Sequence, residues 1–218
     1  MSTKLPCPSC GGEVTLRSFT PYVVCSYCRH ILIKKGENYE DSGEVSGIAE
    51  DMSPFQIGTE GWYQNVHFGL IGRLRMAWDD GFWNEWYAYF DDGRFGWLAE
   101  AQGTLAVLFE NTDTTDQESV RKLIEASDSP LLLHGKEVFI IGVSMVVSDL
   151  KKADCIVVEG ETPRLLMGGR RSASVDLMGS DESVATIEFV GYPRPWRLFT
   201  GRYVGFSELR FTGLRELE

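Results

Sequence analysis

Apolar and polar residues alternate with a period of two along most of this chain, which is typical of β-strands that bury one face. Short turn sequences such as Asp80-Gly81 and Asp92-Gly93 separate the alternating stretches and favour antiparallel hairpins. The expected class is therefore mainly β with antiparallel pairing. The pattern predicts strands over 67–76, 84–90, 94–98, 104–109, 136–147, 154–159, 184–190 and 196–206.

One stretch follows a helical period instead. Val120, Leu123 and Ile124 form an apolar stripe at helical spacing. The four residues from Thr115 to Glu118, just before the stripe, have the form of a capping box. We therefore expect one helix within residues 113–130, connecting two β-rich segments.

The two β-rich segments resemble each other. The segment 67–73 is similar to 137–143, and 93–100 is similar to 201–208, in the same order along the chain. Repeated order of this kind predicts a duplicated small antiparallel β-barrel or β-roll. The second copy is expected to be enlarged by residues 148–195.

Two Cys-x-x-Cys pairs near the N-terminus carry the most specific chemistry of the chain. Cys7 and Cys10 form one pair, Cys25 and Cys28 the other, with fourteen residues between them. Four thiolates at such spacing can surround one ion tetrahedrally, which suits Zn²⁺. A unit this small has little core, so we expect structural zinc to supply most of its folding free energy. Disulfides are the alternative.

These features divide the chain into five expected parts. They are a zinc ribbon (1–35), an acidic linker (36–53), a first β domain (54–112), the connecting helix (113–130) and a second, enlarged β domain (131–218).

Charge is distributed unevenly along the chain. The net charge is −11, yet residues 1–35 hold five basic residues against one acidic residue. An acidic body disfavours nonspecific nucleic-acid binding, because phosphate contacts need clustered Lys and Arg. We find no apolar run near the roughly 20 residues that span a bilayer and no secretion signal, so a cytoplasmic location is expected. Reduced cytoplasmic thiols favour metal over disulfides.

The Cys-Pro-x-Cys-Gly ribbon is followed by Ser-Pro-Phe-Gln-Ile-Gly-Thr at 53–59, Trp-Asn-Glu-Trp-Tyr at 83–87 and the segment 91–100. Over residues 7–109 this series resembles bacterial proteins that carry the domain of unknown function DUF4178. The resemblance implies an N-terminal zinc ribbon and no established enzymatic activity. It also implies a genomic neighbourhood of polyamine-metabolism-like enzymes and small membrane proteins.

Residues 78–100 hold four of the six tryptophans, interleaved with acidic residues. In a strand over 84–90, alternate residues share a face, which assigns Trp86, Ala88 and Phe90 to the core. The other face, with the following turn, would form an exposed, acidic and aromatic site. Aromatic faces and carboxylates together attract ammonium groups, so we expect a cationic ligand here, either a polyamine or a basic peptide. The alternative is an aromatic core with polar turns. The candidate ligand-binding residues are Glu85, Tyr87, Tyr89, Asp91 and Asp92.

Sequence motifs for catalysis are missing. The chain has three histidines and lacks the nucleophile-elbow, phosphate-loop and dinucleotide-binding patterns. Cys155 stands in an apolar run and is expected to be a buried strand residue. We therefore expect a non-enzymatic zinc-ribbon protein with a binding or adaptor role. The alternatives are nucleic-acid binding through the ribbon and an accessory subunit that docks on a membrane-protein complex through strand edges.

Overall fold

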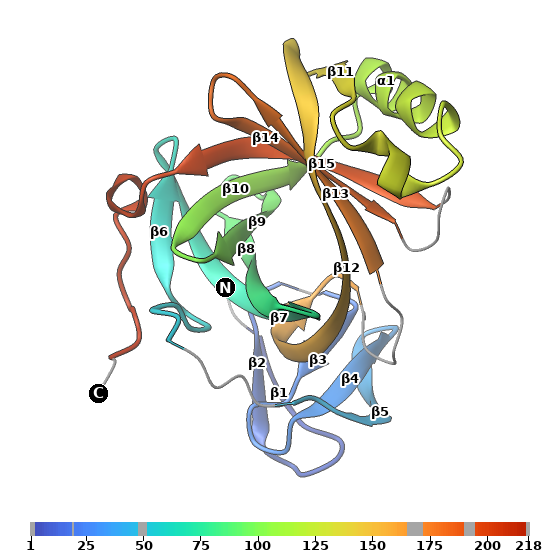
Figure 1. Cartoon of the computed structure of the whole chain (residues 1–218). Coiled ribbons are helices and arrows are strands. Elements are labelled where there is room, and N and C mark those ends of the chain that lie inside the picture. The colour runs from blue at the N-terminus through green and yellow to red at the C-terminus, as the bar shows by residue number, and fades with distance from the viewer. Residues whose placement is uncertain (1–2, 19, 48–51, 165–171, 190–194, 217–218) are drawn as a thin grey trace.

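The computed structural model describes residues 3–18, 20–47, 52–164, 172–189 and 195–216. Their secondary structure is mainly β, as predicted (Figure 1). The strands are β1 (Thr3–Pro6), β2 (Glu13–Leu16), β3 (Tyr22–Val24), β4 (His30–Lys35), β5 (Asn38–Val45), β6 (Glu60–Tyr63), β7 (Val66–Trp78), β8 (Gly81–Phe90), β9 (Phe95–Ala101), β10 (Thr104–Glu110), β11 (Glu137–Ile140), β12 (Val143–Thr162), β13 (Ser172–Gly179), β14 (Ser183–Phe189) and β15 (Trp196–Val204). The helices are α1 (Thr114–Glu125) and the 3-10 helices η1 (Pro130–Leu133) and η2 (Phe206–Leu209).

Eight antiparallel strands form a ring, in the order β7, β8, β9, β10, β15, β14, β13 and β12. Strand β12 closes the ring because it is long enough to pair with two neighbours in succession. Its first half pairs with β13 as far as Ala153, and its second half pairs with β7 from Asp154 onward. The result is a small barrel, whose strands curve around a common centre in Figure 1.

Side chains alternate between the inside and the outside of this barrel. One set, which includes Leu74, Tyr87 and Phe199, packs together in the interior. Outward side chains of β7 to β10 form a second cluster with Phe55, Leu209 and their neighbours. Outward side chains of β12 to β15 form a third cluster beneath α1, η1 and β11. Both outer faces are therefore covered, and the barrel is stabilised from inside and outside.

The two halves of the β region make one barrel together. Strands β7 to β10 form one four-stranded meander and β12 to β15 form another, so a topological repeat is present. The two β domains expected at 54–112 and 131–218 therefore each supply half of one ring. The two sequence segments that resemble each other, 93–100 and 201–208, also occupy different strand positions in their meanders. Residues 93–100 belong mostly to the third strand of their meander, whereas 201–208 begin in the fourth strand of theirs.

Strand β5 lies within the segment predicted to be a linker. It pairs with β4, and β4 pairs with β3. Strand β3 in turn pairs with the last two residues of β12, so the ribbon sheet continues the barrel sheet. Residues 48–51 of the predicted linker lie outside the described residues. In Figure 1 the ribbon, in blue, lies at one end of the barrel and α1 lies at the other.

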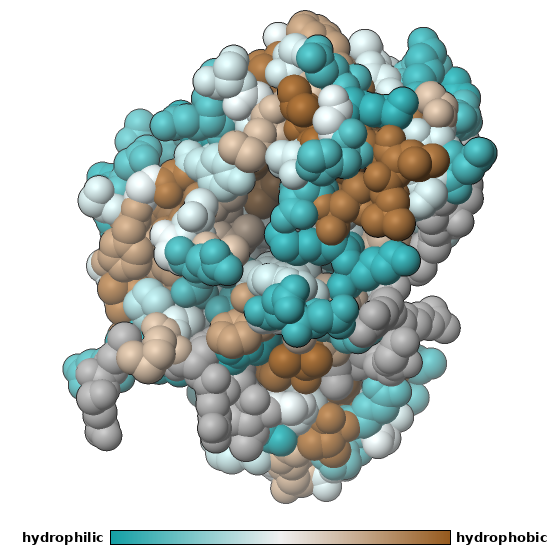
Figure 2. All heavy atoms as spheres, in the orientation of Figure 1, coloured by the Kyte–Doolittle hydropathy of each residue, from teal (hydrophilic) through white to brown (hydrophobic). Residues whose placement is uncertain are grey.

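The connecting helix forms with Val120, Leu123 and Ile124 buried, as predicted. Its N-cap is Asp113, whose carboxylate accepts hydrogen bonds from the N–H groups of Thr115 and Asp116, so the predicted capping box two residues later is wrong. Figure 2 shows a mixed surface on which apolar side chains gather near α1 and η1. In the described part of the chain, no helix has the length and apolar character needed to cross a bilayer.

Candidate metal centre and ligand-binding cavity

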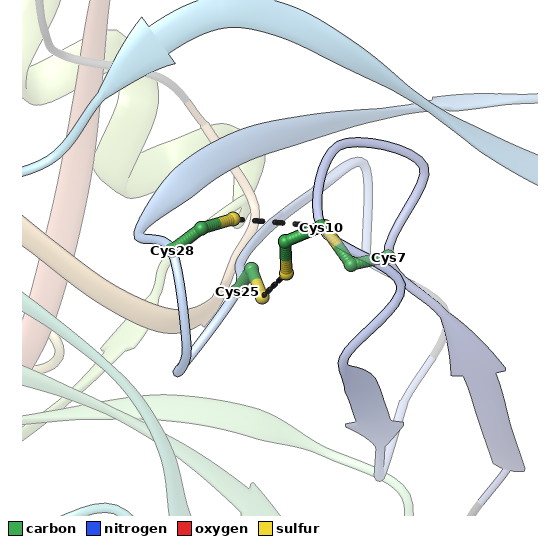
Figure 3. Close-up of side chains that lie close together, drawn as sticks. All are labelled: Cys7, Cys10, Cys25 and Cys28. Carbon is green, nitrogen blue, oxygen red and sulfur yellow. Dashed lines mark hydrogen bonds between the residues drawn. The ribbon is translucent and has the colours of Figure 1, made fainter.

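Four cysteine thiols converge between two loops of the ribbon (Figure 3). The Sγ atoms of Cys7 and Cys28 lie 3.8 Å apart, as do those of Cys10 and Cys25, and all four lie within 4.8 Å of one another. A disulfide requires about 2.05 Å, so the thiols are free. Four sulfurs bound tetrahedrally at about 2.3 Å would be about 3.8 Å apart, which agrees with these two Sγ–Sγ distances. The cluster can therefore hold a metal ion.

The two cysteine loops share one backbone conformation. The N–H of Gly11 donates to the carbonyl of Cys7, and the N–H of Arg29 donates to the carbonyl of Cys25. Gly11 and Arg29 have φ values of 77° and 62°, in the left-handed region. Glycine accepts this conformation without a steric penalty, and arginine does not. The repeated turn directs both thiols of each loop toward the same point.

Backbone hydrogen bonds also affect the acidity of the thiols. Burial raises the pKa of Cys25, but backbone N–H groups of Cys28 and Tyr27 outweigh this and lower the pKa to about 7. His30, next to this cluster, is hydrogen-bonded to Asp41 at 2.7 Å and is not part of the sulfur cluster.

One buried carboxylate attaches the ribbon to the barrel. Glu161, near the end of β12, is only 2% exposed. It accepts hydrogen bonds from the backbone N–H groups of Arg17 and Ser18 and from the hydroxyls of Ser18 and Thr20. The donors all belong to the ribbon, so this one side chain fixes its orientation against β12.

We expect Glu161→Ala to lower the free energy of unfolding by roughly 2–4 kcal/mol, because several buried donors lose their acceptor. Urea unfolding followed by circular dichroism measures the change. Glu40→Ala, on the exposed side of β5, is the matched control and should change the stability by less than about 0.5 kcal/mol. Equal stability of the two variants would contradict the assigned role of Glu161.

A partly open cavity of about 510 Å³ lies inside the barrel, and all eight ring strands contribute side chains to it. Five aromatic rings and several charged groups line it. The aromatic residues are Trp78, Trp83, Trp97, Phe199 and Tyr203, and the charged residues are Glu85, Asp149, Lys151, Asp176 and Glu188. An aromatic wall with a few charged groups is typical of a site for a small organic ligand.

Glu85, Tyr87 and Tyr89 share one face of β8, as predicted, but this face is turned toward the interior of the barrel. Glu85 lines the cavity, Tyr87 is buried in the interior core, and Tyr89 packs against that core. Their predicted exposure is therefore wrong. The alternation pattern could not reveal this, because only closure of the ring decides which face is enclosed.

The other two predicted ligand-binding residues stay outside the cavity. Asp91 and Asp92 lie in the exposed turn between β8 and β9. Asp91 is hydrogen-bonded to His67 at 3.1 Å, and Asp92 accepts a hydrogen bond from Arg94 at 2.8 Å. The structure thus brings one predicted carboxylate into the cavity and leaves two at the surface.

The cavity has more negative than positive groups. Lys151 pairs with Asp149 at 2.5 Å and lies over Trp78, with its Nζ 5.5 Å from the ring centroid. Arg164 makes two contacts to Glu188, one of them at 2.5 Å. Each of these two cations is therefore bonded to its own acid.

Two further cavity acids, Glu85 and Asp176, are less well compensated. The nearest Arg164 nitrogen lies 3.9 Å from Glu85, which accepts a hydrogen bond from Trp83 at 3.0 Å. Asp176 accepts a hydrogen bond from Thr186 at 2.8 Å and has no ion pair within the described part of the chain. Burial, followed by the charge of Glu188, raises the pKa of Glu85 to about 7. Burial likewise raises the pKa of Asp176.

Sequence reasoning missed most of the second half of the cavity. Strand β13 was not predicted, although Ser174 and Asp176 alternate there with the buried Val175 and Leu177. A polar residue at every second position of a strand that is otherwise apolar was the available signal. It could have indicated a polar interior, but not that this interior contains Glu85.

The fold and the cysteine cluster define a class of protein: a four-cysteine ribbon attached to an eight-stranded barrel with an internal cavity. The family model described as "Domain of unknown function (DUF4178)" matches residues 56–206, and the chain belongs to this family. The match covers the complete ring of strands and extends well beyond residue 109, where the sequence resemblance ended. No curated protein and no solved structure matches the chain.

Proposed function

We propose that this protein is a non-enzymatic binding protein whose barrel interior takes up an organic cation such as a polyamine. The observation that supports the proposal best is the charge of the cavity. Four acidic side chains line it against one basic side chain, Lys151, and Arg164 adjoins its wall. The two least compensated acids, Glu85 and Asp176, face aromatic walls. A ligand with ammonium groups would neutralise these carboxylates and pack its carbon chain against the rings.

An organic cation fits the cavity better than a bare metal ion does. Among the described residues, the four cysteines are the one group of three or more ligating side chains close enough to hold an ion. No three carboxylates of the cavity lie close enough together to bind one metal ion, among the residues that the structure describes. An extended ligand whose charges are separated by an apolar chain can contact several of these carboxylates at once.

The ribbon is proposed to bind structural zinc. Four thiolates in a tetrahedral arrangement suit Zn²⁺, and the site has no open position for a substrate. A bound ion would hold the two cysteine loops together in a unit that otherwise has a small core. A protein partner for the ribbon, which would make the protein an adaptor, stays a prediction.

We propose no catalytic step. No histidine lines the cavity within the described residues. The neighbouring Cys155 is a poor nucleophile, because burial raises the pKa of its thiol to about 12.

The affinity for spermidine is expected to fall about tenfold between about pH 8 and about pH 6, because Glu85 must be ionised to bind a cation and its pKa is about 7. The groups that face Glu85 are Trp83, Arg164, Asp176, Glu188 and the thiol of Cys155. Isothermal titration calorimetry at physiological salt measures the affinity, and the two primary amines of spermidine stay protonated throughout this range. No saturable binding at either pH would refute the proposed function. Binding that strengthens at the lower pH would refute the role of Glu85.

A further inference from the structure

Arg164 follows β12 and extends its side chain toward the cavity wall. Its guanidinium contacts the carboxylate of Glu188 through both terminal nitrogens and lies 3.9 Å from Glu85. Its Cζ lies 5.7 Å from the ring centroid of Trp97 and 5.8 Å from that of Phe199. All four contacted residues also line the cavity. Arg164 therefore lies where the cavity is both acidic and aromatic.

The surroundings of Arg164 have the features of a binding site for a guanidinium ligand. Two carboxylates offer charge-assisted hydrogen bonds, and two aromatic rings offer their faces. The three side chains of the ion cluster, Arg164, Glu85 and Glu188, are each less than 20% exposed. The fit of Arg164 is nevertheless incomplete, because its buried Nε–H has no acceptor among the described residues. Such an unsatisfied donor weakens the hold of the site on Arg164.

We infer that this end of the cavity is a guanidinium subsite that Arg164 itself occupies, and that a ligand carrying a guanidinium or primary ammonium group binds there by replacing Arg164. The inference rests on the proposed function, since it requires ligands to enter the cavity. It adds a specificity rule: the ligand must have a terminal cation small enough to fit between Glu85 and Glu188.

Competition between Arg164 and the ligand has a measurable consequence. Arg164 is covalently attached, so it is present at the subsite at a high effective concentration and opposes binding. Removing its charge should leave Glu85 and Glu188 with one cation fewer. A free guanidinium compound should then bind to the variant more tightly than to the natural protein.

The test compares the natural protein with Arg164→Met and with Arg164→Met/Glu188→Gln, using ethylguanidinium at millimolar concentrations as the probe. Ethylurea, which is neutral and of similar shape, is the control ligand. We expect Arg164→Met to bind ethylguanidinium at least about tenfold more tightly than the natural protein does. It should show no binding of ethylurea. The double variant should lose this gain, because Glu188 supplies the main acceptor.

The outcomes of this test distinguish failure of the subsite from failure of the proposed function. If the natural protein binds spermidine but Arg164→Met shows no gain, the subsite is refuted and the proposed function stands. If neither protein binds spermidine or ethylguanidinium, both are refuted. The Arg164→Met variant could fail to fold without a ligand. In that case, folding restored by ethylguanidinium but not by ethylurea would support the subsite. Failure of both compounds to restore folding would overturn it.

Discussion

Cys25→Ser is expected to reduce the zinc content of the purified protein from one ion per chain to less than about 0.1. Cys25 is fully buried and its Sγ lies within 4.8 Å of the other three, so its loss removes one of the four sulfurs that would surround the ion. Structural zinc contributes about 10–16 kcal/mol of apparent binding free energy in small four-ligand modules, so the ribbon should unfold without it. Inductively coupled plasma mass spectrometry gives the metal content, and circular dichroism reports the loss of strand structure.

The fifth cysteine provides a matched control. Cys155 lies on β12, inside the barrel and away from the sulfur cluster. Cys155→Ser should keep one zinc ion per chain. Retention of stoichiometric zinc by Cys25→Ser, or its loss from Cys155→Ser, would show that the ligands are assigned wrongly.

Glu85→Gln is expected to weaken spermidine binding about 10- to 100-fold at about pH 8 while making the protein more stable. The loss of affinity follows from removing one charged acceptor of an ammonium group. The gain in stability follows from the raised pKa of Glu85, about 7 against an ordinary value of 4.5. The folded state favours the neutral carboxyl, so Glu85 destabilises the fold fully above about pH 7, less as the pH falls from 7 toward 4.5, and not below that.

The neutral glutamine should therefore raise the free energy of unfolding by roughly 1–3 kcal/mol at about pH 8, and the difference should disappear near pH 4, below the ordinary pKa of 4.5. Urea unfolding at the two pH values measures it. Asp91→Asn and Asp92→Asn change the net charge equally but lie in the exposed β8–β9 turn. Both should leave spermidine binding unchanged. If these variants lost spermidine binding and Glu85→Gln did not, the binding site would lie in the surface turn and not in the cavity.

The sequence was sufficient to predict features that depend on residues close together along the chain. Alternation in β8 correctly grouped Glu85 with Tyr87 and Tyr89, because neighbours two apart in a strand share a face. The spacing of Cys7, Cys10, Cys25 and Cys28 correctly indicated one cluster, because two short loops joined by a hairpin bring the sulfurs together.

Features that depend on distant pairing could not be predicted. Which face of β8 is enclosed depends on the pairing of β7 with β12 and of β10 with β15, which joins residues about 80 to 100 positions apart. Glu188, Asp176 and Arg164 belong to the site only because the ring closes. The segment from Asn38 to Val45 is rich in acidic and small residues and looked like a linker. Its strand structure comes from pairing with β4 and not from local preference.

The central claim is that the cation binds inside the barrel, and alanine methyl groups can locate it most directly. Ala99 and Ala106 line the cavity, whereas Ala88 is buried in the outer cluster of the same sheet. Methyl NMR spectra recorded during a spermidine titration at physiological salt should show saturable shifts of Ala99 and Ala106, with Ala88 nearly unchanged. Shifts confined to surface alanines, or no saturable shift of Ala99 and Ala106, would contradict binding in the cavity.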